Sequence, residues 1–290
     1  MKLLCPRCEH IEICNQSGDL ISCDLRYGDN SAGNPIVIIC HSFMAFKDWG
    51  FFPYIGERLA KEGFVSLVFN FSHNGVVGAS GRITDFKRFE RNTISKEVQD
   101  LQAVVGAVES GEIGQGIRNS GKEILNRSSI ALLGHSRGGA VAIIHAASDR
   151  RVKALVTLSS VATLERWTGH QKENWRARGY HPLSRNGVVS PLRLGIDSLN
   201  DLEINRDRLS VVRAAGEVSV PWLILHGTED IVVPPREAEQ LYGAANKSIA
   251  ELVLLEKVGH LYNAETPEKD SYQTLNKSLE MIIHWLHKTL

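Results

Sequence analysis

The sequence predicts an α/β fold, a mostly parallel, doubly wound sheet with helices on both of its faces. Short apolar runs rich in β-branched residues, such as Pro35–Cys40 and Phe64–Asn70, alternate along the chain with helical patterns. Runs that are apolar throughout are typical of strands buried on both faces. The chain has 290 residues, 43% of them hydrophobic, which is enough to bury such a sheet. Strands that alternate with helices at this spacing favour parallel pairing through helical crossovers.

The elements follow in a regular order that begins with a hairpin over Ile11–Arg26. Its turn is expected at Gln16–Asp19, where Gly18 supplies a positive φ. This hairpin would form an antiparallel edge of the sheet. The helices expected after it cover residues 49–61, 95–110, 136–147, 235–245 and 272–289, and the strands cover 35–40, 64–70, 129–133, 153–158, 221–225 and 251–255.

Residues 160–219 interrupt this alternation. The stretch contains Trp167, Trp175 and a charged, helix-like run at Ser198–Arg213, and it has no clear strand. It is too long for a plain connection between two elements of a compact domain. We therefore expect a helical insertion, or lid, above the sheet of a single domain that spans residues 1–290.

Composition and charge exclude several classes of function. The 33 basic residues balance 33 acidic ones and the pI is near 7.2, so the long-range positive field of nucleic-acid binders and anionic-membrane binders is missing. No apolar run approaches the roughly 20 residues of a membrane helix, and Pro6 and Arg7 interrupt any secretory signal. We expect a cytoplasmic protein that binds neither nucleic acid nor a bilayer; a monomer and a homodimer both remain open.

The five cysteines all lie within the first 40 residues, and their odd number does not suggest a disulfide framework. Cys5 and Cys8 have the spacing of a zinc knuckle, but a structural zinc site needs four ligands and only His10 and Cys14 lie nearby. A pair of ordinary thiols is the alternative. We expect no metal and no organic cofactor.

The most informative motif is Gly134-His-Ser136-Arg-Gly138, which follows a predicted strand and opens a predicted helix. A sharp turn between strand and helix presents a serine Oγ at the carboxyl edge of the sheet, and small residues are needed where the backbones crowd. A serine is a poor nucleophile unless a base and an orienting carboxylate lie beside it. Asp230 and His260 each follow a later strand, so both are expected at the same edge as Ser136.

The order Ser136, Asp230, His260 and the further motif His41-Ser-Phe43 give the sequence a strong resemblance to the α/β-hydrolase superfamily over roughly residues 9–290. Within it, the chain resembles the dienelactone hydrolase and cinnamoyl (feruloyl) esterase-like branch, which carries a lid between the sixth and seventh core strands. The resemblance implies an oxyanion hole built from the backbone N–H groups of Phe43 and Arg137. The chain departs from the family at Ser42, where a glycine is usual.

Other residues compete for some of these roles. Glu229 adjoins Asp230, and Glu165 follows an earlier strand, so either could supply the acid instead. His41, His135 and His226 are expected to hydrogen-bond the backbones of loops near the site. The side chains expected to contact substrate are His73, Trp167 and Trp175.

These residues predict a serine hydrolase, a carboxylesterase that cleaves small-molecule esters through an acyl-enzyme intermediate. An amide-cleaving, acyl-peptidase-like enzyme would share every residue named, and a non-catalytic ligand-binding homologue is a third reading. Epoxide hydrolases and haloalkane dehalogenases of this fold need Asp at the position of Ser136, which excludes their chemistry. Acyl and alcohol specificity stay open.

Overall fold

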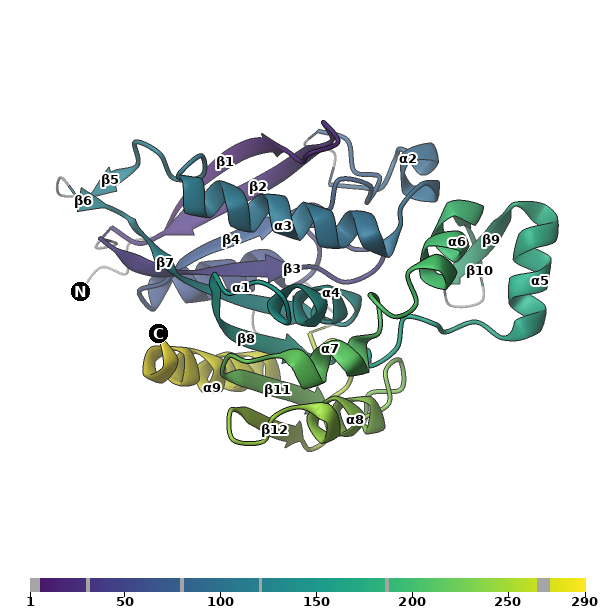
Figure 1. The fold of residues 1–290 in the computed structure, drawn as a ribbon. Helices are drawn as coiled ribbons and strands as arrows, with labels where there is room; N and C mark the ends of the chain where they lie inside the picture. Colours follow the sequence, from purple (N-terminus) through teal and green to yellow (C-terminus); the bar gives the residue numbers. More distant parts are fainter. Residues whose placement is uncertain (1–5, 30–31, 79–80, 120–121, 186–187, 265–271) are drawn as a thin grey trace.

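The central feature of the fold is a sheet of eight strands, seen in a computed structural model that describes residues 6–29, 32–78, 81–119, 122–185, 188–264 and 272–290 (Figure 1). In spatial order the strands are β1 (Arg7–Cys14), β2 (Leu20–Tyr27), β4 (Val65–Phe69), β3 (Asn34–Cys40), β7 (Leu125–His135), β8 (Val152–Leu158), β11 (Trp222–Gly227) and β12 (Ala250–Leu255). Strands β4 to β12 of this order pair in parallel, whereas β1 and β2 are antiparallel. The predicted sheet and its antiparallel hairpin are confirmed.

The turn of the hairpin is fixed by a side chain. Asn15 Oδ1 accepts hydrogen bonds from the N–H groups of Ser17 and Asp19, each at 2.9 Å, and Gly18 has a φ of 78°. An Asn that caps its own turn in this way competes with further strand pairing. The hairpin therefore reverses at the predicted place.

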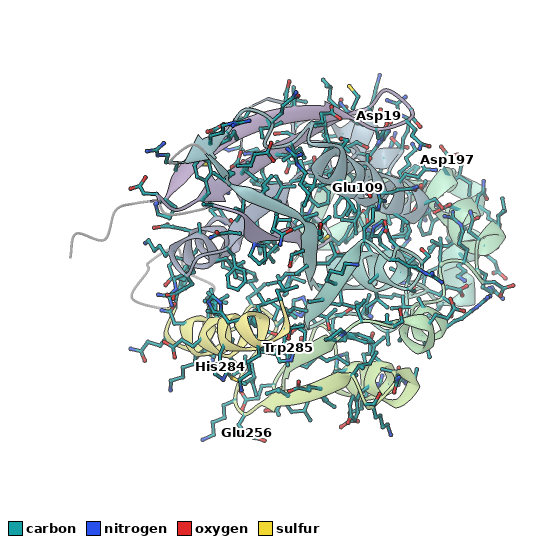
Figure 2. All side chains as sticks on the ribbon, turned by 60° about the vertical axis from the view of Figure 1, so that its left-hand side comes forward. Asp19, Glu109, Asp197, Glu256, His284 and Trp285 are labelled. Carbon is teal, nitrogen blue, oxygen red and sulfur yellow. The ribbon has the colours of Figure 1, made fainter. Side chains whose placement is uncertain are left out.

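Helices cover both faces of the sheet. On one face lie α1 (Phe52–Lys61) and α9 (Gln273–Thr289), and on the other lie α3 (Ile94–Ser110), α4 (Arg137–Ala146), α7 (Val211–Glu217) and α8 (Arg236–Ala244). Neighbouring residues such as Ile38 and Ile39 point into opposite layers, as the pleat of a strand requires. Trp285 of α9, labelled in Figure 2, donates from Nε1 to Glu251 Oε1 at 2.8 Å and so ties this helix to β12.

The insertion lies between β8 and β11 and protrudes beyond one end of the sheet, to the right in Figure 1. It consists of α5 (Gly169–Arg178), β9 (Tyr180–Arg185), β10 (Val188–Gly195) and α6 (Ile196–Ile204), and the short α2 (Phe86–Glu90) packs against it. A small apolar core holds these elements together through Phe89, Trp175, Leu192, Leu194 and Leu199.

The insertion contains a hairpin that the sequence did not predict. Strands β9 and β10 pair in antiparallel fashion, with an irregular register between Val189 and Arg193. Pro182 lies in one strand and Pro191 in the other, and proline cannot donate to a strand ladder. The two prolines are therefore the reason why the sequence pattern did not predict these strands.

The charged run after the hairpin also differs from the expected helix. It forms two helices, α6 and α7, and Ser210 caps the second by accepting from the N–H of Arg213 at 3.4 Å. Val211, Ala214 and Ala215 of α7 join the main core beside the sheet, so the protruding part ends near α6. A separate two-stranded ladder joins β5 (Arg118–Asn119) and β6 (Lys122–Glu123). Among the described residues, no helix is both long and apolar enough to cross a membrane.

Candidate active site

Ser136 occupies a strained turn between β7 and α4. Its backbone has φ 55° and ψ −120°, a conformation that a side chain disfavours, and its N–H donates to the carbonyl of Leu158 at 2.9 Å. A side chain on Gly138 would overlap the carbonyl oxygens of Cys40 and His41, so only glycine lets the first turn of α4 pack against the end of β3. The glycine and the neighbouring strand thereby hold the serine at the end of β7.

Asp230 and His260 form a close pair. Asp230 Oδ2 lies 2.7 Å from His260 Nδ1, while Oδ1 accepts from the N–H groups of Val232 at 3.0 Å and Val233 at 2.8 Å. Burial alone would raise the pKa of Asp230, but hydrogen bonds from His226, His260 and Val233 hold it well below its ordinary value. An ionised carboxylate can only accept, so Nδ1 of His260 carries a proton and Nε2 is left as the basic nitrogen of the neutral ring.

The two loops that carry this pair are locked to each other. The N–H of Thr228 donates to the carbonyl of Leu255 at 2.9 Å, and the N–H of Glu229 donates to that of Val258 at 3.0 Å. A side chain on Gly227 would overlap the backbone of Val258. The spacing between the loop after β11 and the loop after β12 is thus set by backbone contacts.

The competing carboxylates lie elsewhere. The side chain of Glu229 is exposed. Glu165 accepts from Lys172 Nζ and from Arg206 Nε, each at 3.0 Å, at the base of the insertion. Among the described carboxylates, Asp230 is the one that bonds to His260.

Three buried histidines hold the loops of the site, as predicted. His41 donates from Nδ1 to the carbonyl of Ser42 at 2.9 Å, and burial lowers its pKa to about 4. His135 donates from Nε2 to the carbonyl of His260 at 3.0 Å, and burial lowers its pKa to about 3. His226 donates from Nε2 to the carbonyl of Val233 at 2.8 Å. Each of these residues donates one ring N–H to a backbone carbonyl near Ser136, Asp230 or His260.

The loop after β3 has a defined peptide orientation. The carbonyl of Ser42 accepts from His41 Nδ1 and from the N–H of Ala45, the latter at 3.2 Å. In a trans peptide the C=O and the next N–H point in opposite directions, so the N–H of Phe43 faces away from these partners. Phe43, Arg137 and Ser136 all line the same cavity.

That cavity has a volume of about 680 Å³ and lies over Ser136 and His260. Its lining is mainly apolar and combines the sheet edge with the insertion, through side chains that include Met44, Trp49, Leu164, Trp167, Leu183 and Leu202. Apart from Trp167, these residues were not predicted. Leu183 belongs to the β9–β10 hairpin, which the prolines made hard to predict from the sequence. Met44 has a positive φ of 58°, and no sequence pattern predicts this conformation. Val232 also lines the cavity, and its place beside Asp230 was a usable signal.

Of the three residues predicted to contact substrate, one lines the cavity and two do not. Trp167 lines the cavity. Trp175 is fully buried in the core of the insertion, with its ring 5.1 Å from that of Trp167. His73 lies outside the lining, where Nδ1 is 2.9 Å from Ser72 Oγ and Nε2 is 3.3 Å from Lys96 Nζ. Burial, together with the charge of Lys96, lowers the pKa of His73 to about 4.

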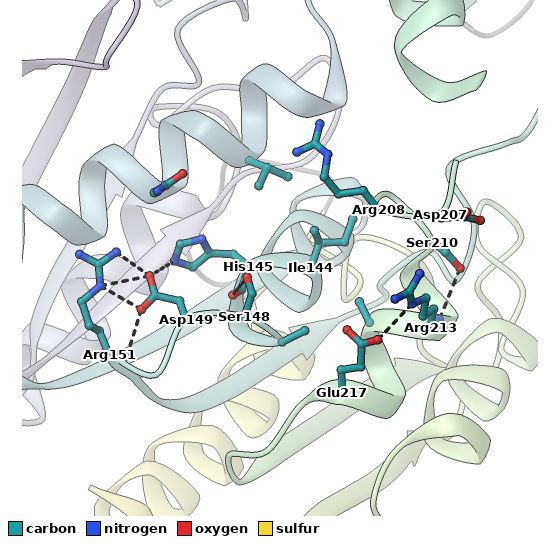
Figure 3. A pocket seen from close by; sticks show the side chains of 14 residues that line it. Ile144, His145, Ser148, Asp149, Arg151, Asp207, Arg208, Ser210, Arg213 and Glu217 are labelled. Carbon is teal, nitrogen blue, oxygen red and sulfur yellow. Dashed lines mark hydrogen bonds and ion pairs between the residues drawn. The ribbon is translucent and has the colours of Figure 1, made fainter. Parts of the chain in front are cut away.

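A second cavity, of about 740 Å³, lies among α3, α4 and α7 (Figure 3). Several of its charged side chains pair with one another: Asp149 Oδ2 lies 2.6 Å from Arg151 Nη2 and 3.0 Å from His145 Nε2, and Arg213 Nε lies 3.0 Å from Glu217 Oε1. Arg208 also lines this cavity, and its Nη2 donates to Ser95 Oγ. Ser136 and His260 line the first cavity, which is therefore the better candidate for chemistry.

The cysteines supply no described metal centre. Cys8 and Cys14 are exposed, Cys23 and Cys40 are buried, and all four are free thiols. Cys5, the first cysteine of the pair with zinc-knuckle spacing, lies outside the described residues. Among the described residues, no group of three or more His, Cys, Asp and Glu side chains is arranged to hold a metal ion.

Comparisons with known proteins identify a relative by sequence and several solved structures with a similar fold. The chain is 22% identical over 264 residues to an uncharacterized 31.7 kDa protein from the traX-finO intergenic region of Escherichia coli, covering 80% of this chain and 85% of that protein. The esterase domain of a Rhodothermus marinus protein is similar in structure, with a TM-score of 0.63, 19% identity and coverage of 97% and 98% of the two chains. Est1E from Butyrivibrio proteoclasticus with ferulic acid bound gives a TM-score of 0.67, 19% identity and coverage of 96% and 98%.

A sequence profile of the alpha/beta hydrolase family matches residues 37–270, a span that contains Ser136, Asp230 and His260. It covers well over half of the chain. Together with the eight-stranded sheet, this match shows that the protein belongs to the alpha/beta hydrolase family.

Proposed function

We propose that this hydrolase is a serine carboxylesterase with Ser136 as nucleophile, His260 as general base and acid, and Asp230 as the group that orients His260. The observation that carries the proposal is the 2.7 Å contact between Asp230 and His260, in a site where His260 and Ser136 line one cavity. The neutral imidazole has Nδ1 occupied and Nε2 free to accept a proton.

The proposed reaction has two halves. Ser136 Oγ bonds to the ester carbonyl carbon as its proton passes to His260 Nε2, and His260 then returns that proton to the alkoxide oxygen as the alcohol leaves. Water adds to the acyl-enzyme by the same steps and releases the carboxylic acid. In both halves the backbone N–H groups of Phe43 and Arg137 would stabilise the oxyanion, and this chemistry needs neither a metal nor an organic cofactor.

The substrate class follows from the cavity. A cavity of about 680 Å³ with an apolar lining favours a small molecule with an apolar or aromatic acyl group. Ferulic acid, an aromatic acid, is bound to the similar Est1E structure. A corresponding amide would pass through the same steps, and its cleavage is the second candidate activity.

A fluorophosphonate probe tests the assignment, because it reacts with an activated serine and spares ordinary ones. We expect labelling of the wild type and of Ser198→Ala, a control serine that lines the same cavity. Ser136→Ala should abolish labelling and lower ester hydrolysis about 10⁴-fold or more. Persistent labelling of folded Ser136→Ala, checked by circular dichroism, would show that the nucleophile is another residue.

The assay should use p-nitrophenyl esters of increasing chain length, aryl cinnamates and the matching anilides. Turnover of the esters with no measurable turnover of the anilides would support the carboxylesterase. Ready turnover of the anilides as well would identify the amide-cleaving alternative.

A further inference from the structure

The side chain of Arg137 contacts the residue on the far side of the proposed oxyanion hole. Its guanidinium lies over the ring of Phe43, with Cζ 4.4 Å from the ring centroid. At this separation a guanidinium and an aromatic ring attract each other. Arg137 and Phe43 are also the two residues whose backbone N–H groups face the cavity in the proposed mechanism, so one side-chain contact joins both donors.

The guanidinium is itself anchored. Arg137 Nε lies 3.2 Å from Glu97 Oε2, and the two side chains are only 11% and 5% exposed. Glu97 is held in turn, because its Oε1 accepts from Asn92 Nδ2 at 2.7 Å. Since Glu97 belongs to α3, a helix of the scaffold fixes the guanidinium from one side while the ring of Phe43 packs on another.

The two donors belong to different segments, and backbone contacts hold only part of the second segment against the first. Arg137 opens α4, so its N–H is fixed by the helix, whereas Phe43 lies in the loop after β3. The start of that loop is held where the backbones of Cys40 and His41 press against Gly138. Beyond this point, the ring of Phe43 contacts Arg137 and also lies 5.9 Å from the ring of Phe89.

We propose that the Arg137 side chain is a positioning group: held by Glu97, it stacks on Phe43 and fixes the distance between the two oxyanion donors. The inference rests on the proposed serine esterase function. A donor gives its full stabilisation only at the position that the oxyanion occupies in the transition state, and small displacements are costly. In this role the side chain acts through Phe43, not on the nucleophile or the base.

The main test is Arg137→Met, which keeps the backbone N–H and removes the stack. We expect kcat to fall about 10- to 100-fold with KM little changed, because the contact matters in the transition state. Affinity for a trifluoromethyl ketone, which forms a tetrahedral adduct with the serine, should fall in parallel with kcat. Affinity for the product acid should stay the same.

Two further variants separate the stack from other effects. Phe43→Leu should cause a similar loss, and the double variant with Arg137→Met should lose little more, since both changes break one contact. Phe43→Tyr keeps the ring and should retain most of the activity that Phe43→Leu loses. If Arg137→Met folds poorly because Glu97 is left unpaired, the pair Arg137→Met and Glu97→Gln removes both charges and gives the same test.

An unchanged kcat in folded Arg137→Met would overturn the proposal. So would a change confined to KM that depended on the charge of the substrate, because that result would mean direct contact between the guanidinium and the substrate. Failure of the proposed function has a different signature: wild-type Ser136 would not react with the fluorophosphonate at all.

Discussion

The edge of the sheet and the insertion above it are built by different means. At the edge, the loops that carry Asp230 and His260 are locked by backbone hydrogen bonds and by the close approach of Gly227 to Val258. The insertion is held by a small apolar core around Trp175 and by ion pairs on its surface, such as Arg176 with Glu203. Backbone contacts define positions to a fraction of an ångström, whereas exposed ion pairs add little stability.

The difference suits the two regions to different parts of the proposed function. The proposed reaction moves a proton from Ser136 to His260 and on to the substrate, which needs the fixed positions that the sheet edge provides. The choice among substrates can depend on side chains that are easier to exchange, and the insertion supplies Trp167, Leu183 and Leu202 to the cavity.

The largest effect is expected at the sheet edge, for Asp230→Asn. The amide cannot hold Nδ1 of His260 protonated as the carboxylate does, so kcat should fall about 10³- to 10⁴-fold. Glu229→Gln is the matched control, because its exposed side chain is adjacent in sequence. Ester hydrolysis by purified variants measures both. Equal losses of kcat in the two variants would show that the acid is misassigned and that the sheet edge does not fix Asp230 for this role.

The two regions also differ in how far the sequence predicts them. Apolar runs and the glycines around Ser136 are local signals, and they predicted the sheet, the turn and the residues that follow each strand. The stacking of Arg137 on Phe43 and its pairing with Glu97 join segments far apart in the chain, and no local pattern encodes such contacts. The same holds for Trp175, since an aromatic in an insertion can face a cavity or pack its core, and only the fold decides.

An intermediate effect is expected in the insertion, where the two tryptophans should behave differently. Trp167→Ala enlarges the cavity and should change the ratio of kcat/KM between short and aromatic acyl groups by about 10-fold, with fluorophosphonate labelling intact. Trp175→Ala empties the core of the insertion, at a cost of about 3–5 kcal/mol in packing. The loss of kcat/KM in Trp175→Ala should be uniform across substrates. A selective change in Trp175→Ala alone would mean that the cavity extends into that core.

The smallest effects concern two ion pairs, one in the scaffold of the sheet and its helices and one in the insertion. Burial alone would raise the pKa of Asp149, but hydrogen bonds from His145 and Arg151 hold it well below its ordinary value. A lowered folded pKa adds stability that is fully present above the unfolded pKa of about 4 and is lost as the pH falls through the folded pKa. Asp149→Asn should therefore lower Tm by about 2–6 °C at pH 7, corresponding to about 1–3 kcal/mol, and by less at low pH.

Glu203→Gln is the counterpart in the insertion. Its partner Arg176 is 50% exposed, so the pair should contribute at most about 0.5 kcal/mol. Thermal unfolding followed by circular dichroism at pH 7 and pH 3 compares the two variants. Equal shifts in Tm would remove the energetic contrast between scaffold and insertion.

The close contact of Gly227 with Val258 has a consequence for how such a chain can diversify. Adding or deleting one residue in either loop would displace Asp230 and His260 together, because the backbones of the two loops share their hydrogen bonds. Variation in length is then expected in the part of the stretch between β8 and β11 that protrudes beyond the sheet, before α7 joins the main core. For protein engineering, the protruding elements α5 to α6 are the part to exchange between homologues, while the loops after β11 and β12 should be transferred only as a unit.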